Sequence, residues 1–173
     1  VNIMSDNVYL GNPNLKKANT PIEFTEENVI EFVKCKNDPV YFARKYIKIV
    51  SLDEGLVPFN MYDFQEKLID RFHKNRFNIC KMPRQTGKST TCISYLLHYA
   101  VFNDNVNIAV LANKASTARD LLGRLQLAYE NLPSWMQQGI ISWNKGSLEL
   151  ENGSKISANS TSSSAVRGGS YNV

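Results

Sequence analysis

The sequence predicts an α/β fold in which helices cover a parallel sheet. Short apolar runs alternate with helical patterns from residue 77 to residue 132, as in βαβα units. A loop that ends in Gly87-Lys88-Ser89 lies between the first apolar run and the helix that follows it. Strand, loop and helix in this order are the context of a phosphate-binding loop. The predicted class is therefore a three-layer P-loop NTPase with an N-terminal helical extension.

Composition places the chain among ordinary globular proteins. It has 173 residues, of which 43% are hydrophobic and 21% charged, with a net charge of +4. No apolar run approaches the ~20 residues of a membrane span, and the N-terminus lacks a signal-peptide pattern, so we expect no membrane association. Lysines and arginines are spread along the chain, so charge alone does not predict nucleic-acid binding. Cys35, Cys80 and Cys92 lie in apolar segments without metal-ligand spacing, which predicts buried, reduced thiols.

Residues 1–58 are expected to form an N-terminal arm and helical subdomain, and residues 59–173 a partial ATPase domain. Many Asn, Gly and Pro residues predict an irregular arm over residues 1–24. Thr25 is the expected N-cap of a first helix, and Asp38-Pro39 the expected start of a second. The apolar residues of the second helix would be Phe42, Tyr46, Ile47 and Ile49. Residues 52–58 then read as a linker.

The next predicted helix region begins near Asn60 and carries Gln65 beside its apolar face. A carboxamide both donates and accepts hydrogen bonds, so one Gln can read the N6 and N7 edge of adenine. Taken alone, Gln65 is expected to be a solvated helix residue, and its position just upstream of a phosphate loop raises the hypothesis that it reads adenine. His73 and His98 lack partners at metal-ligand spacing and are expected to be surface or packed residues.

The loop itself follows a predicted strand over residues 77–81 and precedes a helix with an apolar face. Backbone N–H groups and the helix N-terminus would bind phosphates, Lys88 would reach the β- and γ-phosphates, and Ser89 would bind Mg²⁺. Arg84 brings a second charge near the γ-phosphate; a surface ion pair is its alternative role. The full P-loop pattern has a glycine at the position that Met82 occupies, so the loop departs from it there. A second strand over 106–111 and a helix from Ala118 to Leu132 complete the βαβα unit.

The C-terminal stretch predicts a hairpin at Asn152-Gly153, because alternating runs flank it. Residues 160–164 form a Ser/Thr run, and Arg167 follows on a glycine-rich loop from which a guanidinium can reach a phosphate. Trp135 and Trp143 are expected to pack at the core or its rim. No apolar strand ending in paired acidic residues occurs, so the Mg²⁺-binding Asp and the catalytic Glu of such hydrolases are missing from these residues.

Several stretches together resemble the N-terminal ATPase portion of the large terminase subunit of T-even-like tailed bacteriophages, whose fold is RecA-like. The resemblance covers nearly the whole chain from about Val8. The stretches that carry it are Leu10-Gly11-Asn12-Pro13-Asn14-Leu15-Lys16-Lys17-Ala18-Asn19, Tyr62-Asp63-Phe64-Gln65, Pro83-Arg84-Gln85-Thr86-Gly87-Lys88-Ser89-Thr90, residues 143–154 and Ala165-Val166-Arg167-Gly168.

The resemblance implies a motor in which ATP hydrolysis drives double-stranded phage DNA into a preformed capsid. It implies an ATP and Mg²⁺ site, with Mg²⁺ at Ser89, Lys88 on the phosphates, Arg84 sensing the γ-phosphate and Arg167 as a candidate trans-acting finger. The expected nucleotide-binding residues are Asn60, Gln65, Pro83, Arg84, Gln85, Thr86, Gly87, Lys88, Ser89 and Thr90. The implied partners are DNA, the portal protein, the small terminase subunit and further copies in a ring on the procapsid, in the host-cell cytoplasm.

The acidic strand, the coupling motif and the nuclease domain of that family are absent from these residues. We therefore expect nucleotide binding with negligible turnover by the 173-residue chain alone, with hydrolysis, translocation and DNA cleavage belonging to the parent protein. Three alternatives remain open. A helicase would share the upstream Gln and the loop, a non-enzymatic nucleic-acid-binding or assembly subunit would carry a vestigial loop, and a small-molecule kinase would need a substrate lid.

Overall fold

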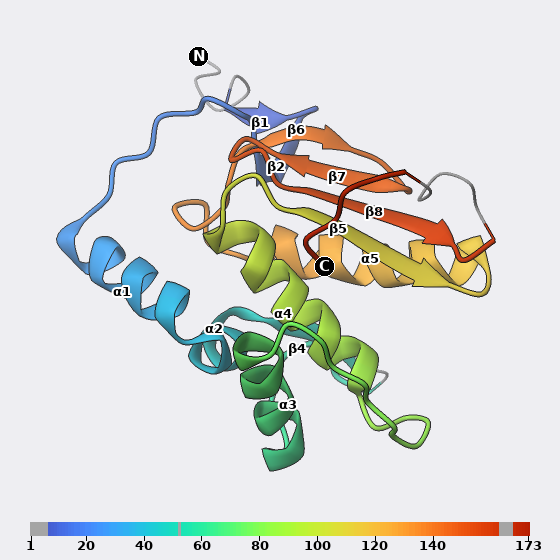
Figure 1. Ribbon diagram of the computed structural model, residues 1–173. Helices are drawn as coiled ribbons and strands as arrows, with labels where there is room; N and C mark the ends of the chain where they lie inside the picture. Colours follow the sequence, from blue (N-terminus) through green and yellow to red (C-terminus); the bar gives the residue numbers. More distant parts are fainter. Residues whose placement is uncertain (1–6, 52, 163–167) are drawn as a thin grey trace.

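The computed structural model describes residues 7–51, 53–162 and 168–173, which form an α/β fold with three small sheets (Figure 1). In chain order the elements are β1 (Val8–Tyr9), β2 (Asn12–Lys16), α1 (Glu26–Asn37), α2 (Pro39–Tyr46), β3 (Lys48–Ser51), β4 (Gly55–Pro58), α3 (Asp63–Lys74), α4 (Lys88–Phe102), β5 (Asn107–Ala112), α5 (Ala115–Glu130), β6 (Ile140–Trp143), β7 (Ser147–Leu150) and β8 (Lys155–Ser160).

The main sheet has the strand order β5-β8-β7-β6 and is mixed, not parallel as predicted. Only β5 and β8 run parallel, in register from Asn107↔Lys155 to Ala112↔Ser160. The predicted hairpin at Asn152-Gly153 is confirmed, with Gly153 at φ +80°. A tight turn returns the chain antiparallel to the strand before it, whereas a parallel neighbour needs a long crossover. The βα pattern up to residue 132 therefore did not predict that the three strands after it would be joined by tight turns and would pair antiparallel.

Helix α5 packs against β5 and β8, and α4 packs against α5 on the same side of the sheet (Figure 1). Side chains alternate between the two faces of each strand. The face of the sheet toward α5 is apolar and buried, while Glu149 and Ser157 lie at the alternate positions of β7 and β8, on the other face. The buried residues of the face toward α5 are Ile108, Leu148, Leu150, Ile156 and Ala158. The described residues thus show an α/β arrangement with α4 and α5 on one face of the main sheet. This is two layers, where three were predicted.

The predicted strand over residues 77–81 is not formed, so this prediction was wrong. Phe77 is 84% exposed and Ile79 fully exposed. A strand needs a neighbour to take its backbone hydrogen bonds. Beside β5, the Ala109 N–H donates to the Val173 carbonyl (3.0 Å) and the Asn172 N–H to the Asn107 carbonyl (2.8 Å). Asn172 and Val173 therefore occupy the edge of β5 that a strand over residues 77–81 would need. Cys80 is exposed as a result, which corrects the prediction of three buried thiols.

The N-terminal part is more regular than predicted. Thr25 and Asp38 cap α1 and α2 as expected, with their side chains accepting from the Asn28 and Tyr41 N–H groups. Two predictions were wrong: residues 8–16 of the arm form the β1–β2 hairpin, and residues 48–51 and 55–58 form the paired strands β3 and β4 instead of a helix end and part of a linker. Gly55, at φ +74°, permits the turn between β3 and β4.

One hydrophobic cluster joins residues 1–58 to the rest of the chain. The Phe42 ring on α2 is fully buried and lies 5.4 Å, centroid to centroid, from both His98 and Phe102 on α4. Trp135 packs edge-on against Tyr46, and Trp143 packs at a tilt against Tyr129, which confirms their predicted packing at the core or its rim. The two predicted parts therefore share a core.

His98 makes the fold sensitive to acid. Its imidazole is 2% exposed, and its Nε2 lies 2.9 Å from the Cys35 carbonyl. Burial lowers the pKa of His98 to about 4, against about 6.5 when unfolded. The unfolded chain then binds the extra proton between pH 6.5 and 4, so stability falls as the pH falls through that window. We expect this group to cost the fold about 3 kcal/mol by pH 4.

The test is urea unfolding at several pH values from 7 to 4 for the wild type and His98→Gln. Glutamine offers an N–H to the Cys35 carbonyl and does not titrate. The slope of stability against pH should be shallower in the variant, and equal slopes would contradict the prediction.

Candidate functional site: the phosphate-binding loop

The loop before α4 has the backbone of an anion-binding turn. Gln85 and Gly87 adopt left-handed conformations, with φ of 62° and 73°. From Arg84 to Thr90, no backbone N–H donates a hydrogen bond to any residue that the structure describes. Alternating left-handed residues turn successive N–H groups toward one point, where an anion can accept from several of them. The first N–H groups of α4 add the positive end of the helix dipole. The residues present therefore fit a phosphate group.

Side chains of the loop hold it in this shape. Lys88 Nζ and Thr86 Oγ1 both donate to the Pro83 carbonyl, each at 3.1 Å, and Thr91 Oγ1 donates to the Gly87 carbonyl at 3.0 Å. Lys88 thus folds back over the loop, where its ammonium group can exchange a carbonyl for a phosphate oxygen. Ser89 lies at the first turn of α4, half-buried.

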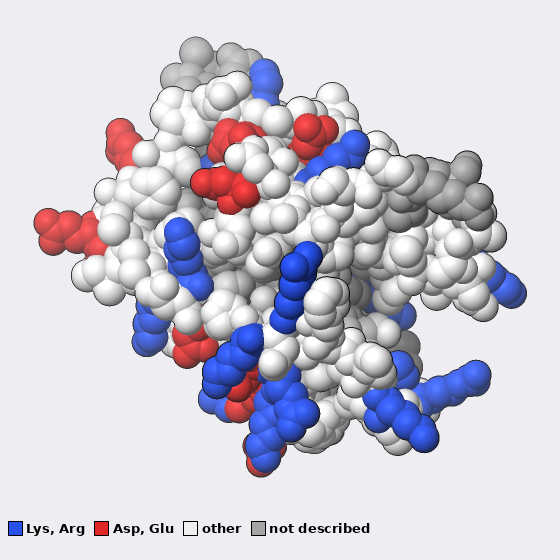
Figure 2. All heavy atoms as spheres, in the orientation of Figure 1, with Lys and Arg blue, Asp and Glu red and all other residues white. Residues whose placement is uncertain are grey.

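The field at the loop is positive. Arg84 is exposed and forms no ion pair within the described ranges 7–51, 53–162 and 168–173. Figure 2 shows basic groups and no acidic ones at the lower right of this face, where the loop projects. An uncompensated cluster of positive charge attracts anions and speeds their encounter.

Gln65 clamps the loop to the start of α3. Its Oε1 accepts from the Tyr62 N–H (2.9 Å), and its Nε2 donates to the Thr86 carbonyl (3.2 Å). The residue is 3% exposed, and a Cβ added at Gly87 would collide with its Nε2. The sequence interpretation missed this clamp, although Gln at the third helical position commonly reaches back to the cap N–H. Asn60 is exposed and makes no hydrogen bond to the loop within the described residues.

We expect Gln65→Ala to destabilise the protein. The change leaves the Tyr62 N–H and the Thr86 carbonyl without their partner, and both bonds are partly buried. The cost is up to about 1–3 kcal/mol for each group that water does not reach. The melting temperature should fall by roughly 5 °C or more, as measured by circular dichroism. Gln126→Ala is the matched control, because that carboxamide makes one exposed bond, to the Asn144 carbonyl. Equal shifts in the two variants would argue against a clamp.

Arg167, the predicted trans-acting residue, lies outside the described residues. Within the residues that are described, no group of three or more His, Cys, Asp or Glu side chains could hold a metal ion. No helix in the same part of the chain is long and apolar enough to cross a membrane.

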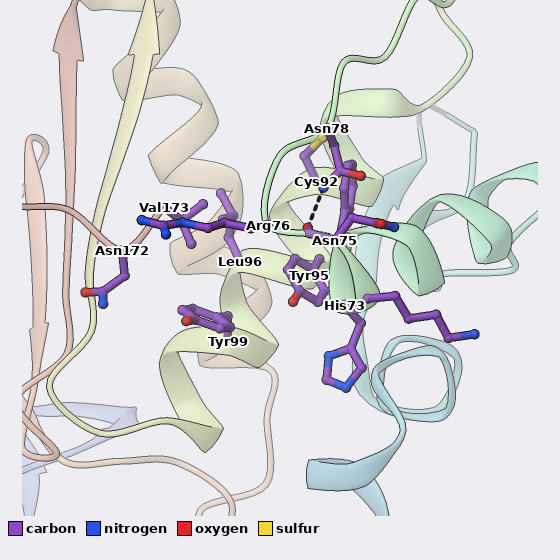
Figure 3. A pocket seen from close by; sticks show the side chains of 12 residues that line it. His73, Asn75, Arg76, Asn78, Cys92, Tyr95, Leu96, Tyr99, Asn172 and Val173 are labelled. Carbon is purple, nitrogen blue, oxygen red and sulfur yellow. Dashed lines mark hydrogen bonds between the residues drawn. The ribbon is translucent and has the colours of Figure 1, made fainter.

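A cavity of about 560 Å³ lies along α4, away from the loop side chains (Figure 3). Cys92, Tyr95 and Tyr99 of α4 form one wall. Residues 75, 76 and 78 and the C-terminal Asn172 and Val173 approach from either side. Burial raises the pKa of the Cys92 thiol, which keeps it protonated at neutral pH. Because no strand forms over residues 77–81, this wall of α4 is left uncovered, which accounts for the cavity. None of residues 83–90 lines it.

Comparison with known families identifies the chain. A family model described as "Terminase large subunit, T4likevirus-type, N-terminal" matches residues 79–173, which is more than half of the chain and includes the whole loop. Large terminase subunits act in the packaging of viral DNA and are generally ATPases. The match agrees with the resemblance carried by residues 83–90 and 143–154. The chain belongs to this family, as the N-terminal part of a T4likevirus-type large terminase subunit.

Proposed function

We propose that the loop binds ATP with Mg²⁺ and that this site powers the packaging of double-stranded DNA into a viral capsid. The observation that carries the proposal is the set of free backbone N–H groups from Arg84 to Thr90 at the start of α4, with Lys88 folded over them. Fixed donors at a helix N-terminus stabilise phosphate without reorganisation.

Each residue of the loop has a role in this proposal. The backbone from Gln85 to Thr90 holds the phosphates, and the Lys88 ammonium leaves the Pro83 carbonyl when nucleotide binds. Lys88 contacts the β- and γ-phosphates, Ser89 completes the Mg²⁺ shell, and Arg84 stabilises charge on the γ-phosphate during transfer. Arg167 would act on the site of a neighbouring copy. Asn60 and Gln65 border the nucleotide, Gln65 as the adenine contact and as the side chain that holds the loop in place.

Translocation needs partners that this chain meets in the assembled motor. We propose a homo-oligomeric ring, docked on the procapsid through the portal protein, supplied with DNA by the small terminase subunit, in the host-cell cytoplasm. ATP hydrolysis in that ring would be coupled to movement of the DNA. DNA cleavage and the water-activating acidic residues would lie elsewhere in the parent protein.

Calorimetric titration of the chain with ATP, with and without Mg²⁺, tests the site. We expect saturable binding that Mg²⁺ strengthens roughly tenfold, one metal–ligand contribution of about 1.4 kcal/mol. Ser89→Ala should lose most of this strengthening, because it removes the hydroxyl that faces the metal. Ser116→Ala, an exposed change on α5, should keep it. Absence of saturable ATP binding by the wild type would refute the proposal.

A further inference from the structure

Helix α1 presents an exposed apolar face at the edge of the molecule (Figure 1). Val29, Ile30 and Val33 on this face are 48%, 69% and 50% exposed. At 3.6 residues per turn they lie within about 100° of one another around the helix axis. The opposite side of the helix packs on the protein, where the Phe32 ring lies 5.0 Å, centroid to centroid, from the Phe102 ring of α4. We call Val29, Ile30 and Val33 the outer face of α1.

Opposite charges lie at the two ends of this outer face. Glu26 and Glu27 are in the first turn of α1, and Lys34 and Lys36 are in the last turn. All four side chains are exposed, and in the described part of the chain none of them forms an ion pair. In Figure 2 acidic groups lie at the left edge, where α1 begins, and basic groups lie farther along the helix. Lys34 Nζ lies 3.9 Å from the centroid of the Tyr41 ring, and its N–H groups can still bind a carboxylate.

A second copy of α1 in antiparallel orientation complements both the apolar residues and the charges. A twofold axis near residue 31 sets the first half of one helix against the second half of the other. Glu27 and Lys34 are seven residues apart, so they lie on the same flank of the helix. Glu27 of each copy therefore faces Lys34 of the other, at both ends of the contact. A parallel pair would set Glu27 against Glu27 and Lys34 against Lys34, and like charges repel.

We propose that α1 is a contact surface for a second copy of this chain, with the two helices antiparallel and the outer face of each covering that of the other. The contact is isologous and closes on itself, so it pairs two chains and is separate from the contacts of the proposed ring. It is also weak. A helix of 12 residues is about 18 Å long. Its contact buries less than the ~1,200 Å² of a standard interface, and we expect a Kd on the order of 100 μM.

Sedimentation velocity of the full chain over a range of concentrations on both sides of this Kd tests the contact. The buffer contains a reductant, because Cys80 is exposed and can form disulfides between chains. Ile30→Glu places an unpaired charge at the centre of the contact and should weaken dimerisation at least tenfold. Val50→Glu, the same charge at a 63% exposed apolar position on β3, is the matched control and should leave the Kd within about twofold of the wild type.

Exchanging the charges tests the orientation of the two helices. Glu27→Lys and Lys34→Glu are measured separately and as an equimolar mixture at low salt, where exposed charges interact most strongly. Each variant alone sets like charges against each other at both ends of an antiparallel pair, so it should dimerise about tenfold more weakly. In the mixture the introduced charges face opposite charges, so a mixed dimer should form with the affinity of the wild type.

Each result supports or overturns the inference. A wild type that stays monomeric at the highest concentration overturns it. A dimer that Ile30→Glu leaves intact, or that Val50→Glu abolishes, places the contact elsewhere and also overturns it. Charge variants that associate like the wild type, or a mixture that forms no mixed dimer, overturn the antiparallel order. None of these measurements needs ATP, so failure of the proposed function leaves this inference standing, and the reverse also holds.

Discussion

Replacing Lys88 by alanine is expected to weaken ATP binding by about 10- to 100-fold. A hydrogen bond from a charged donor contributes about 1.5–3 kcal/mol, and each 1.4 kcal/mol is tenfold in affinity. In the structure, Lys88 Nζ donates to the Pro83 carbonyl, and a triphosphate offers it charged oxygen atoms instead. Fluorescence titration with a labelled ATP analogue, or calorimetry, measures the loss directly.

Lys155→Ala is the matched control for this variant. It removes the same charge from an exposed position on β8, so it measures the part of the effect that comes from net charge alone. We expect it to change the affinity less than twofold at physiological salt, where charges farther apart than about 8 Å are screened. Unchanged ATP binding in Lys88→Ala would instead favour the alternative of a nucleic-acid-binding or assembly subunit with a vestigial loop.

The loop before α4 could be predicted from the sequence as a candidate phosphate-binding site because its residues are consecutive. The roles proposed for Gly87, Lys88 and Ser89 depend on their adjacency, and the helix that follows has a clear apolar period. The clamp by Gln65 could not be predicted in this way, because it joins segments far apart in the chain: Gln65 bonds a residue 21 positions away.

The errors in the fold have a similar cause. Helices α1 to α5 were all predicted, because their apolar faces, and for α1 and α2 their caps, are local, whereas a strand depends on its neighbour. Residues 77–81 have strand-like composition, but Asn172 and Val173 occupy the adjacent edge of β5. Residues 48–58 have two short apolar runs on either side of Gly55, which is a hairpin pattern, and the glycine was misread as part of a linker.

A second large effect is expected in the core that joins the two predicted parts of the chain. Phe42 on α2 is completely buried, and its ring contacts those of His98 and Phe102 on α4 and of Tyr46 on its own helix. Phe42→Ala should lower the free energy of unfolding by about 3–5 kcal/mol, the cost of losing the ring and leaving a cavity. The melting temperature should fall by roughly 10 °C. Phe77→Ala, the same change at an 84% exposed position, should cost less than about 0.5 kcal/mol.

The form of the transition carries as much information as its midpoint. Because Phe42 and Tyr46 of α2 contact α4 and Trp135, residues 1–58 and 59–173 should unfold together. Far-ultraviolet circular dichroism and tryptophan fluorescence should then give one coincident transition in the wild type, and again in Phe42→Ala at a lower temperature. Since both tryptophans, Trp135 and Trp143, lie in the second part, a dichroism change that precedes the fluorescence change would mean that residues 1–58 unfold independently. In that case the helical extension would be a separate subdomain. The packing of α2 on α4 would then contribute little to the stability of the loop before α4, against the expectation from a shared core.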